Sequence, residues 1–140
     1  MRKLTLLALL ALATVLLAGC ASAVAAPLTG GTVNAALADM KISVDRSSVP
    51  AGPVTFVVKN NGAVIHELVV IQTDLAQDKL PMDMDEAGKM DETGNLGETG
   101  DVGVGSSKTF TVTLPAGHYV LMCNEVGHYT SGMHMAFTVN

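Results

Sequence analysis

The sequence predicts an all-β domain in which short strands pack as a β-sandwich, with a small β-barrel as the alternative. Short segments rich in β-branched residues recur along the chain. Turn signals with Gly, Pro or Asn separate these segments, and no part of the predicted domain has the period of a long amphipathic helix. Many short strands at this spacing are typical of two antiparallel sheets packed face to face.

The first predicted strands lie between residues 37 and 59. Apolar and polar side chains alternate clearly over residues 40–44, which indicates an extended segment with one buried face. Residues 54–59 are mostly β-branched or aromatic, as strands prefer. Between them, two prolines and a glycine at residues 47–53 predict a turn.

The later strands carry one of the candidate ligands. Residues 60–62, Asn-Asn-Gly, are a turn signal, and residues 63–73 predict the next strand, which contains His66. Pro-Ala-Gly at residues 115–117 predicts another turn. Further strands are predicted at residues 109–114, 119–123 and 135–139.

Residues 74–101 differ from the rest of the chain. They contain nine acidic residues, two lysines and four glycines, with no run of strand-forming residues. They predict a long loop, or a loop with one short helix, and such a loop within a compact domain is usually functional or mobile. The acidic run indicates either a solvated face or a docking surface that steers a basic protein partner.

The amino terminus has the features of a signal peptide at residues 1–19. Two basic residues precede an apolar run at residues 4–17 that is too short to span a bilayer comfortably. The motif Leu-Ala-Gly-Cys that follows resembles the lipobox of bacterial lipoproteins, and the resemblance implies that Cys20 carries a lipid. Cleavage by an ordinary signal peptidase in the next alanine-rich stretch is the alternative.

We therefore expect an exported lipoprotein that is anchored to a membrane, in the periplasm or at the cell surface. Residues 20–31 are rich in small side chains and predict a tether. Residues 32–140 predict a single domain, since about 120 residues remain after cleavage and suffice for one.

Charge and cysteine content narrow the possible partners. The formal net charge of the chain is −5, and removal of the basic signal makes the mature part more acidic. Nucleic acid requires a basic face, so no nucleic-acid partner is expected. Two cysteines in an exported protein often form a disulfide. Here Cys20 lies at the processing point and Cys123 lies in a cluster of candidate ligands, so we expect no disulfide between them.

The carboxyl-terminal region contains three candidate metal ligands, namely Cys123, His128 and Met133, and His66 lies far upstream. One thiolate, two imidazoles and a weak thioether form the donor set of blue copper electron-transfer sites. Structural zinc sites use four strong Cys or His donors, for which Met is a poor substitute. A buried cysteine that only packs as a small apolar residue is the alternative for Cys123.

The segments around these residues resemble the cupredoxins, the blue copper family that includes plastocyanin, azurin and rusticyanin. The resemblance is carried by residues 61–70, NGAVIHELVV, and by residues 117–139, which begin GHYVLMC. The four-residue intervals from Cys123 to His128 and from His128 to Met133 are similar to those of rusticyanin and sulfocyanin. The family implies a Greek-key β-sandwich with one type 1 copper site, and its ligands map onto His66, Cys123, His128 and Met133.

Four neighbouring residues are alternatives or bystanders. Met135 is the rival axial ligand, but it starts the last predicted strand and alternates with Phe137. The same alternation predicts His118 to be an exposed strand residue. His134 is expected to face solvent. Glu67 follows His66 and could support it by a hydrogen bond, but alternation along a strand would point it away, so we expect a surface residue.

The function expected is that of a single-electron carrier that cycles between Cu(I) and Cu(II) and exchanges electrons with redox protein partners. Such a protein performs no substrate chemistry alone and is not an enzyme. A copper-binding module for delivery or storage is the alternative. In that case Met82, Met84 and Met90 would form an auxiliary copper site, whereas otherwise they pack against the base of their loop.

Overall fold

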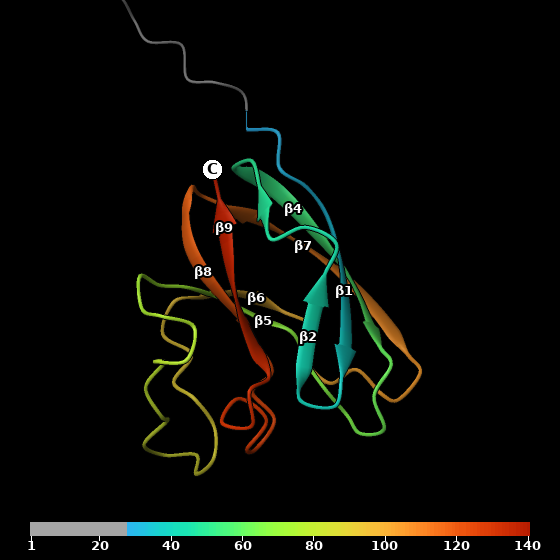
Figure 1. Cartoon of the computed structure of the whole chain (residues 1–140). Coiled ribbons are helices and arrows are strands. Elements are labelled where there is room, and N and C mark those ends of the chain that lie inside the picture. The colour runs from blue at the N-terminus through green and yellow to red at the C-terminus, as the bar shows by residue number, and fades with distance from the viewer. Residues whose placement is uncertain (1–27) are drawn as a thin grey trace, which may run out of the picture.

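The computed structural model describes residues 28–140, which form two packed β-sheets (Figure 1). The strands are β1 (Gly31–Ala38), β2 (Lys41–Val44), β3 (Ser48–Val49), β4 (Gly52–Asn60), β5 (Val69–Gln72), β6 (Asn95–Glu98), β7 (Ser107–Leu114), β8 (Gly117–Met122) and β9 (His134–Val139). The predicted all-β sandwich is therefore confirmed.

The two sheets are mixed and not purely antiparallel. One has the strand order β2-β1-β4-β7 and the other has the order β3-β9-β8-β5-β6. β1 pairs with β4 in parallel, and β3 pairs with β9 in parallel. After β1 and β2 the chain crosses to the second sheet as β3 and then returns as β4. This crossover makes two pairs parallel, so the prediction of antiparallel pairing alone was wrong.

The core between the sheets is built around aromatic side chains. Phe56 on β4 is fully buried, and its ring centroid lies 5.2 Å from that of Phe110 and 5.9 Å from that of Phe137. Phe110 belongs to the same sheet as Phe56, whereas Phe137 belongs to the opposite sheet. Burial alternates strictly along β4, which is the periodicity that the sequence predicts for residues 54–59.

The acidic segment, residues 74–101, covers the outer face of the second sheet. It forms β6 at the sheet edge and otherwise consists of turns, with no helix in the described residues. A second apolar cluster lies beneath it, formed by Val69, Ile71, Leu80, Met90, Val120, Met122 and Tyr129. β8 is therefore buried on both faces. The short β6, which contains Asn95 and Gly97, was not predicted because strand propensity there is low and pairing with β5 supplies the order.

The predicted strand at residues 63–73 is shorter than expected. Only Val69–Gln72 is a strand, and His66 lies before it, in an isolated bridge with Val102. The Asn60 side chain donates to the main-chain oxygens of Val64 and Val102, at 2.8 Å each. Side-chain partners thus replace the ladder hydrogen bonds that a longer strand would need.

The two ends of the sandwich differ in content. The start of β1 and the carboxyl terminus lie together, because Gly30 N–H donates to Ala51 O at 3.0 Å and Ala51 N–H donates to Asn140 O at 2.8 Å. The β1–β2 turn and the loop between β8 and β9 lie at the opposite end (Figure 1). The candidate ligands belong to that opposite end.

The predicted signal peptide and the lipid attachment residue, Cys20, lie outside the described residues. Within residues 28–140, none of the structure is a helix long and apolar enough to cross a bilayer.

Candidate metal centre

Three of the predicted ligands meet at the loop end of the sandwich. The donor atoms of His66, Cys123 and His128 all lie within 4.8 Å of one another. The two imidazole Nδ1 atoms are 3.2 Å apart. The Cys123 Sγ lies 3.9 Å from Nδ1 of His66 and 3.3 Å from Nδ1 of His128.

These separations fit a single metal ion. A divalent ion bound in the plane of three donors, at about 2.0 Å from nitrogen and about 2.3 Å from sulfur, places the donors about 3.5 to 3.8 Å apart. The observed separations, 3.2, 3.3 and 3.9 Å, lie close to that range. A thiolate with two imidazoles is the equatorial donor set of a blue copper site.

The loop from Cys123 to Met133 is closed by its own main chain. Cys123 N–H donates to Met133 O, and Met133 N–H donates to His128 O, both at 3.1 Å. Met133 and Cys123 are fully buried in the main core, and His66 is fully buried as well. His128 is only partly buried, so its imidazole forms the solvent edge of the centre.

Two of the converging side chains have shifted pKa values. Burial raises the pKa of the Cys123 thiol to about 11, so the thiol is protonated at neutral pH and a bound cation displaces that proton. Burial, followed by the nearby His66 ring, lowers the pKa of His128. A neutral His128 keeps a lone pair available for a metal.

Asp39, in the β1–β2 turn, orients the upstream histidine. Its Oδ1 lies 3.0 Å from Nε2 of His66. A carboxylate accepts, so Nε2 carries the hydrogen and the lone pair of Nδ1 points into the centre. The hydrogen bond from His66, with that from Ala63 N–H, lowers the pKa of Asp39. Nothing in the sequence signals this contact, which depends on the register that brings two distant turns together.

Gly62 leaves room for this pair. A Cβ atom at Gly62 would lie 2.4 Å from Oδ1 of Asp39 and 2.7 Å from Nε2 of His66. The Asn-Asn-Gly sequence predicts a turn at this place, but the turn alone does not reveal that the missing side chain protects a ligand contact. The glycine is therefore part of the centre through the space that it leaves.

Glu67 is half-buried beside the thiol, so its prediction as a surface residue was wrong. Its N–H donates to Cys123 Sγ at 3.4 Å, and its Oε1 accepts the N–H of Asn124 at 3.1 Å. Burial, together with the nearby carboxylates of Glu125, Glu92 and Glu98, raises the pKa of Glu67 to about 7. The prediction failed because residues 63–68 are not a strand, so alternation does not apply to them.

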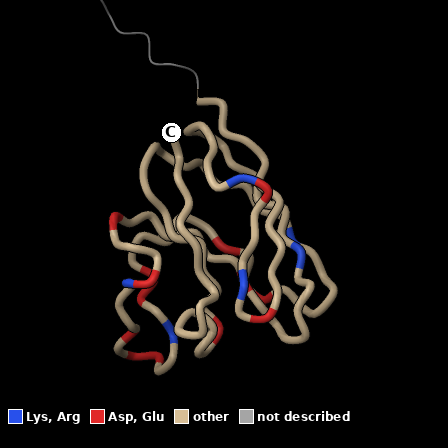
Figure 2. Tube along the Cα trace, viewed as in Figure 1, with Lys and Arg blue, Asp and Glu red and all other residues tan. Residues whose placement is uncertain are grey.

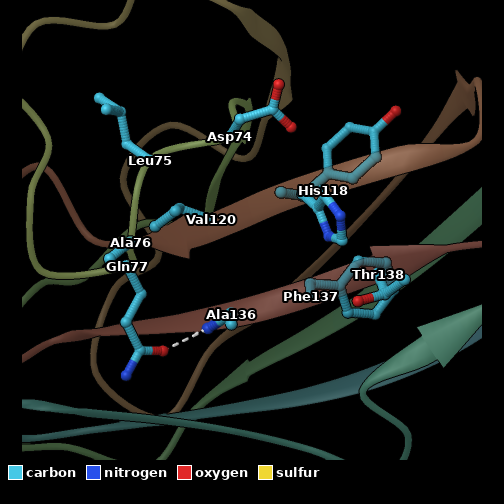
Figure 3. A pocket seen from close by; sticks show the side chains of 10 residues that line it. Asp74, Leu75, Ala76, Gln77, His118, Val120, Ala136, Phe137 and Thr138 are labelled. Atoms are coloured by element: carbon cyan, nitrogen blue, oxygen red, sulfur yellow. Dashed lines mark hydrogen bonds between the residues drawn. The ribbon is translucent and has the colours of Figure 1, made fainter.

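The other candidate residues lie outside the cluster. His118 is exposed, as predicted, and lines a hollow on the outer face of β8 and β9 with Asp74 and Thr138 (Figure 3). His134 is partly buried, not solvent-facing as expected, because its ring packs at 4.7 Å from that of Tyr129. Met135 packs against the main core.

The methionines of the acidic segment are divided between core and solvent. Met90 is buried in the second apolar cluster, which is the packing role expected for such residues. Met84 is 94 % exposed, and Met82 is 48 % exposed and pairs with Met90 only through a main-chain bridge.

Comparison with known proteins identifies the family. A model of the sulfocyanin (SoxE) domain matches residues 13–140. The chain belongs to the sulfocyanin family. Sulfocyanins are cupredoxins, so the family expected from the ligand segments is confirmed, with copper as the cofactor. None of the curated proteins compared with the chain matches it.

Solved structures agree on the fold. Dithionite-reduced auracyanin from Roseiflexus castenholzii is 24% identical, with a TM-score of 0.60 over 81% of this chain and 99% of that chain. Auracyanin A, a "blue" copper protein from Chloroflexus aurantiacus, is 23% identical, with a TM-score of 0.59 over 79% of this chain and 100% of that chain. Rusticyanin from Thiobacillus ferrooxidans is 22% identical, with a TM-score of 0.59 over 80% of this chain and 79% of that chain. The sandwich described above is therefore a cupredoxin fold.

The space at Gly62 gives a prediction about the centre. Gly62→Ala forces Asp39 away from His66, so we expect metal affinity to fall about tenfold, the lower end of the effect of losing a partner of a metal-ligating histidine. Metal titration with the purified domain measures this affinity. Gly103→Ala is the matched control, because a Cβ there meets only Ser106 Oγ at an ordinary 3.5 Å. Equal affinities in the two variants would contradict the role of the Asp39–His66 pair.

Proposed function

We propose that this chain is an extracytoplasmic type 1 copper protein that carries single electrons, with His66, Cys123, His128 and Met133 as the ligands. The observation that supports the proposal most strongly is the buried convergence of Cys123 Sγ with two imidazole nitrogens that come from separate parts of the chain. Bound copper would supply the one-electron couple, and the protein would perform no substrate chemistry of its own.

Each of the four residues has a distinct part in this proposal. The Cys123 thiolate and the two imidazoles would be the strong donors to copper, and the Met133 thioether would be a weaker fourth donor. His66, Cys123 and Met133 are fully buried, so they would exclude water from the ion on their side. The closed loop and the Asp39 contact hold the donors in place, and a fixed donor set would limit rearrangement when an electron moves.

We propose His128 as the edge through which electrons leave. It is the one proposed ligand that is only partly buried, and it lies at the loop end of the sandwich. A redox partner that docks over this loop would come closest to the ion, and the remaining ligands are covered by the protein.

The negative charge of the acidic segment favours a redox partner with a basic docking face. Acidic residues gather along the loops beside the β8–β9 loop (Figure 2). The two regions are in contact, since Gly127 N–H donates to Gly88 O at 2.9 Å. Asp85 and Glu86 are exposed close to that contact. A negative field beside the exit edge would steer a basic redox protein toward His128.

We also propose export and membrane attachment through a lipid on Cys20. The support is the signal-like sequence of residues 1–20 together with a thiol-ligated copper centre of a family that works by exchanging electrons with other proteins. An anchor would hold the carrier at the membrane where such partners reside.

The absorption spectrum tests the copper centre. Cu(II) added to the purified domain is expected to give an intense blue or green colour that ascorbate bleaches. Cys123→Ser should abolish the colour and leave the domain folded by circular dichroism, because the core is apolar. His118→Ala is the control and should keep the colour. A colourless wild-type complex that releases copper readily would favour delivery or storage instead.

The axial assignment is tested by potentiometry. Met133→Leu should keep the colour and raise the reduction potential, because loss of a sulfur donor from the axial side disfavours Cu(II). Met135→Leu is the matched control, with the same change two residues away in the core, and should leave the potential nearly unchanged. The reverse result would transfer the axial role to Met135.

The docking proposal is tested by the rate of electron exchange with a basic c-type cytochrome as a probe. The second-order rate should fall as ionic strength rises. The double variant Asp85→Asn with Glu86→Gln should flatten this dependence. Asp74→Asn removes an exposed carboxylate from the other end of the segment, beside His118, and should change the salt dependence less. A rate that is independent of salt would contradict electrostatic steering.

Lipidation is tested by mass spectrometry of the mature protein from a bacterial host. A mature amino terminus at Cys20 that carries acyl chains is expected, and Cys20→Ala should release the domain from the membrane fraction. A mature protein that starts at a later alanine without lipid would show ordinary signal cleavage.

A further inference from the structure

The residue after the ligand cysteine makes more hydrogen bonds than its place in a loop requires. Asn124 is 3 % exposed. Its Oδ1 accepts the N–H of Met90 at 2.7 Å, and its Nδ2 donates to Met90 O at 3.0 Å and to Glu92 Oε1 at 2.8 Å. Its side-chain amide therefore pairs with the Met90 main chain as a neighbouring strand would, and both of its hydrogens are used.

Met90, whose main chain bonds to the Asn124 side chain, is itself held by packing. Its side chain is buried in the second apolar cluster under the acidic segment. That cluster includes Val120 and Met122 of β8, the strand that ends just before Cys123. The Asn124 side chain thus ties the start of the loop after Cys123 to Met90, which packs against β8.

Two further contacts attach the same segment to the same loop. Gly127 N–H donates to Gly88 O at 2.9 Å. The Tyr129 hydroxyl accepts Leu80 N–H at 2.9 Å and donates to Gln77 O at 2.8 Å. Gly127 and Tyr129 flank His128. The loop is therefore held from one side at three positions, and none of the three is a proposed ligand.

The opposite side of the same loop contacts the main core. Cys123 N–H donates to Met133 O at 3.1 Å, and the Met133 side chain is buried between the sheets. Residues 77–92 thus act from the outside, while the main core acts from the inside. The two sets of contacts together hold Cys123 Sγ and His128 Nδ1 at 3.3 Å.

From these contacts we infer that Asn124 is a positioning residue for the copper centre. Through its side chain, residues 77–92 hold the loop from Cys123 to Met133 in place. The inference deepens the proposed function and rests on it for the identity of the ligands. Loss of the Asn124 side chain frees the main chain between Cys123 and His128 to move, so the thiolate and the imidazole lose their fixed separation. Loss of a residue that orients metal ligands typically lowers metal affinity by about 10- to 100-fold.

The first test uses the metal-free protein, so it does not depend on copper chemistry. Asn124→Ala is expected to speed amide hydrogen exchange at Cys123 and Met133 tenfold or more, as measured by NMR. Asn95→Ala is the matched control. It removes hydrogen bonds within the acidic segment, to Glu92 and Glu98, and leaves both hydrogen bonds between Asn124 and the Met90 main chain in place. Equal exchange rates in the two variants would overturn the inference.

The second test uses the copper-loaded protein. Asn124→Ala should shift the sulfur-to-copper absorption band and the reduction potential, and should release copper at least tenfold faster than Asn95→Ala. Glu92→Gln keeps an acceptor oxygen for Nδ2 and should retain wild-type values. If Asn124→Ala does not fold, Tyr129→Phe removes another contact between residues 77–92 and this loop, and should give smaller changes in the same direction. An unshifted band in both variants would overturn the inference.

The two tests separate the inference from the proposed function. Faster exchange in metal-free Asn124→Ala together with a colourless wild-type copper complex would contradict the proposed function and support the positioning role of Asn124. A blue wild-type complex whose band and exchange rates are insensitive to Asn124 would do the opposite.

Discussion

The rest of the structure depends on one convergence: the buried thiol that follows β8 and the buried imidazole from the loop before β5 lie only 3.9 Å apart. Cys123 and His66 are both fully buried, which is costly for groups that must give up protons or accept a cation. The sandwich meets this cost with hydrogen bonds around each group. Glu67 N–H reaches the sulfur, and Asp39 takes the outer hydrogen of His66.

The supports of the centre come from every side of the loop end. The β1–β2 turn supplies Asp39, the turn before His66 supplies the empty space at Gly62, and the acidic segment supplies the partners of Asn124. None of these residues is a proposed ligand. The centre therefore depends on these three segments as well as on the loop from Cys123 to Met133, and the two sheets hold all of them in register.

The sequence predicted the sandwich, most strands and the cluster of His66, Cys123 and His128, because strand alternation and donor chemistry are local and readable. It missed what depends on pairing between distant segments. The parallel strand pairs follow from a crossover between sheets, and β6 forms from residues of low strand propensity because β5 pairs with it. Glu67 was misplaced because alternation was extended past the end of a strand, and Asp39 has no local signal at all.

The separation of the chain end from the metal end has a practical consequence. The carboxyl terminus lies beside the start of β1, at the pole away from the β8–β9 loop (Figure 1). A tag or surface linkage added after Asn140 would therefore leave the His128 edge unobstructed. Immobilised on an electrode in this way, the domain would present that edge to the solution, where mobile proteins could exchange electrons with it.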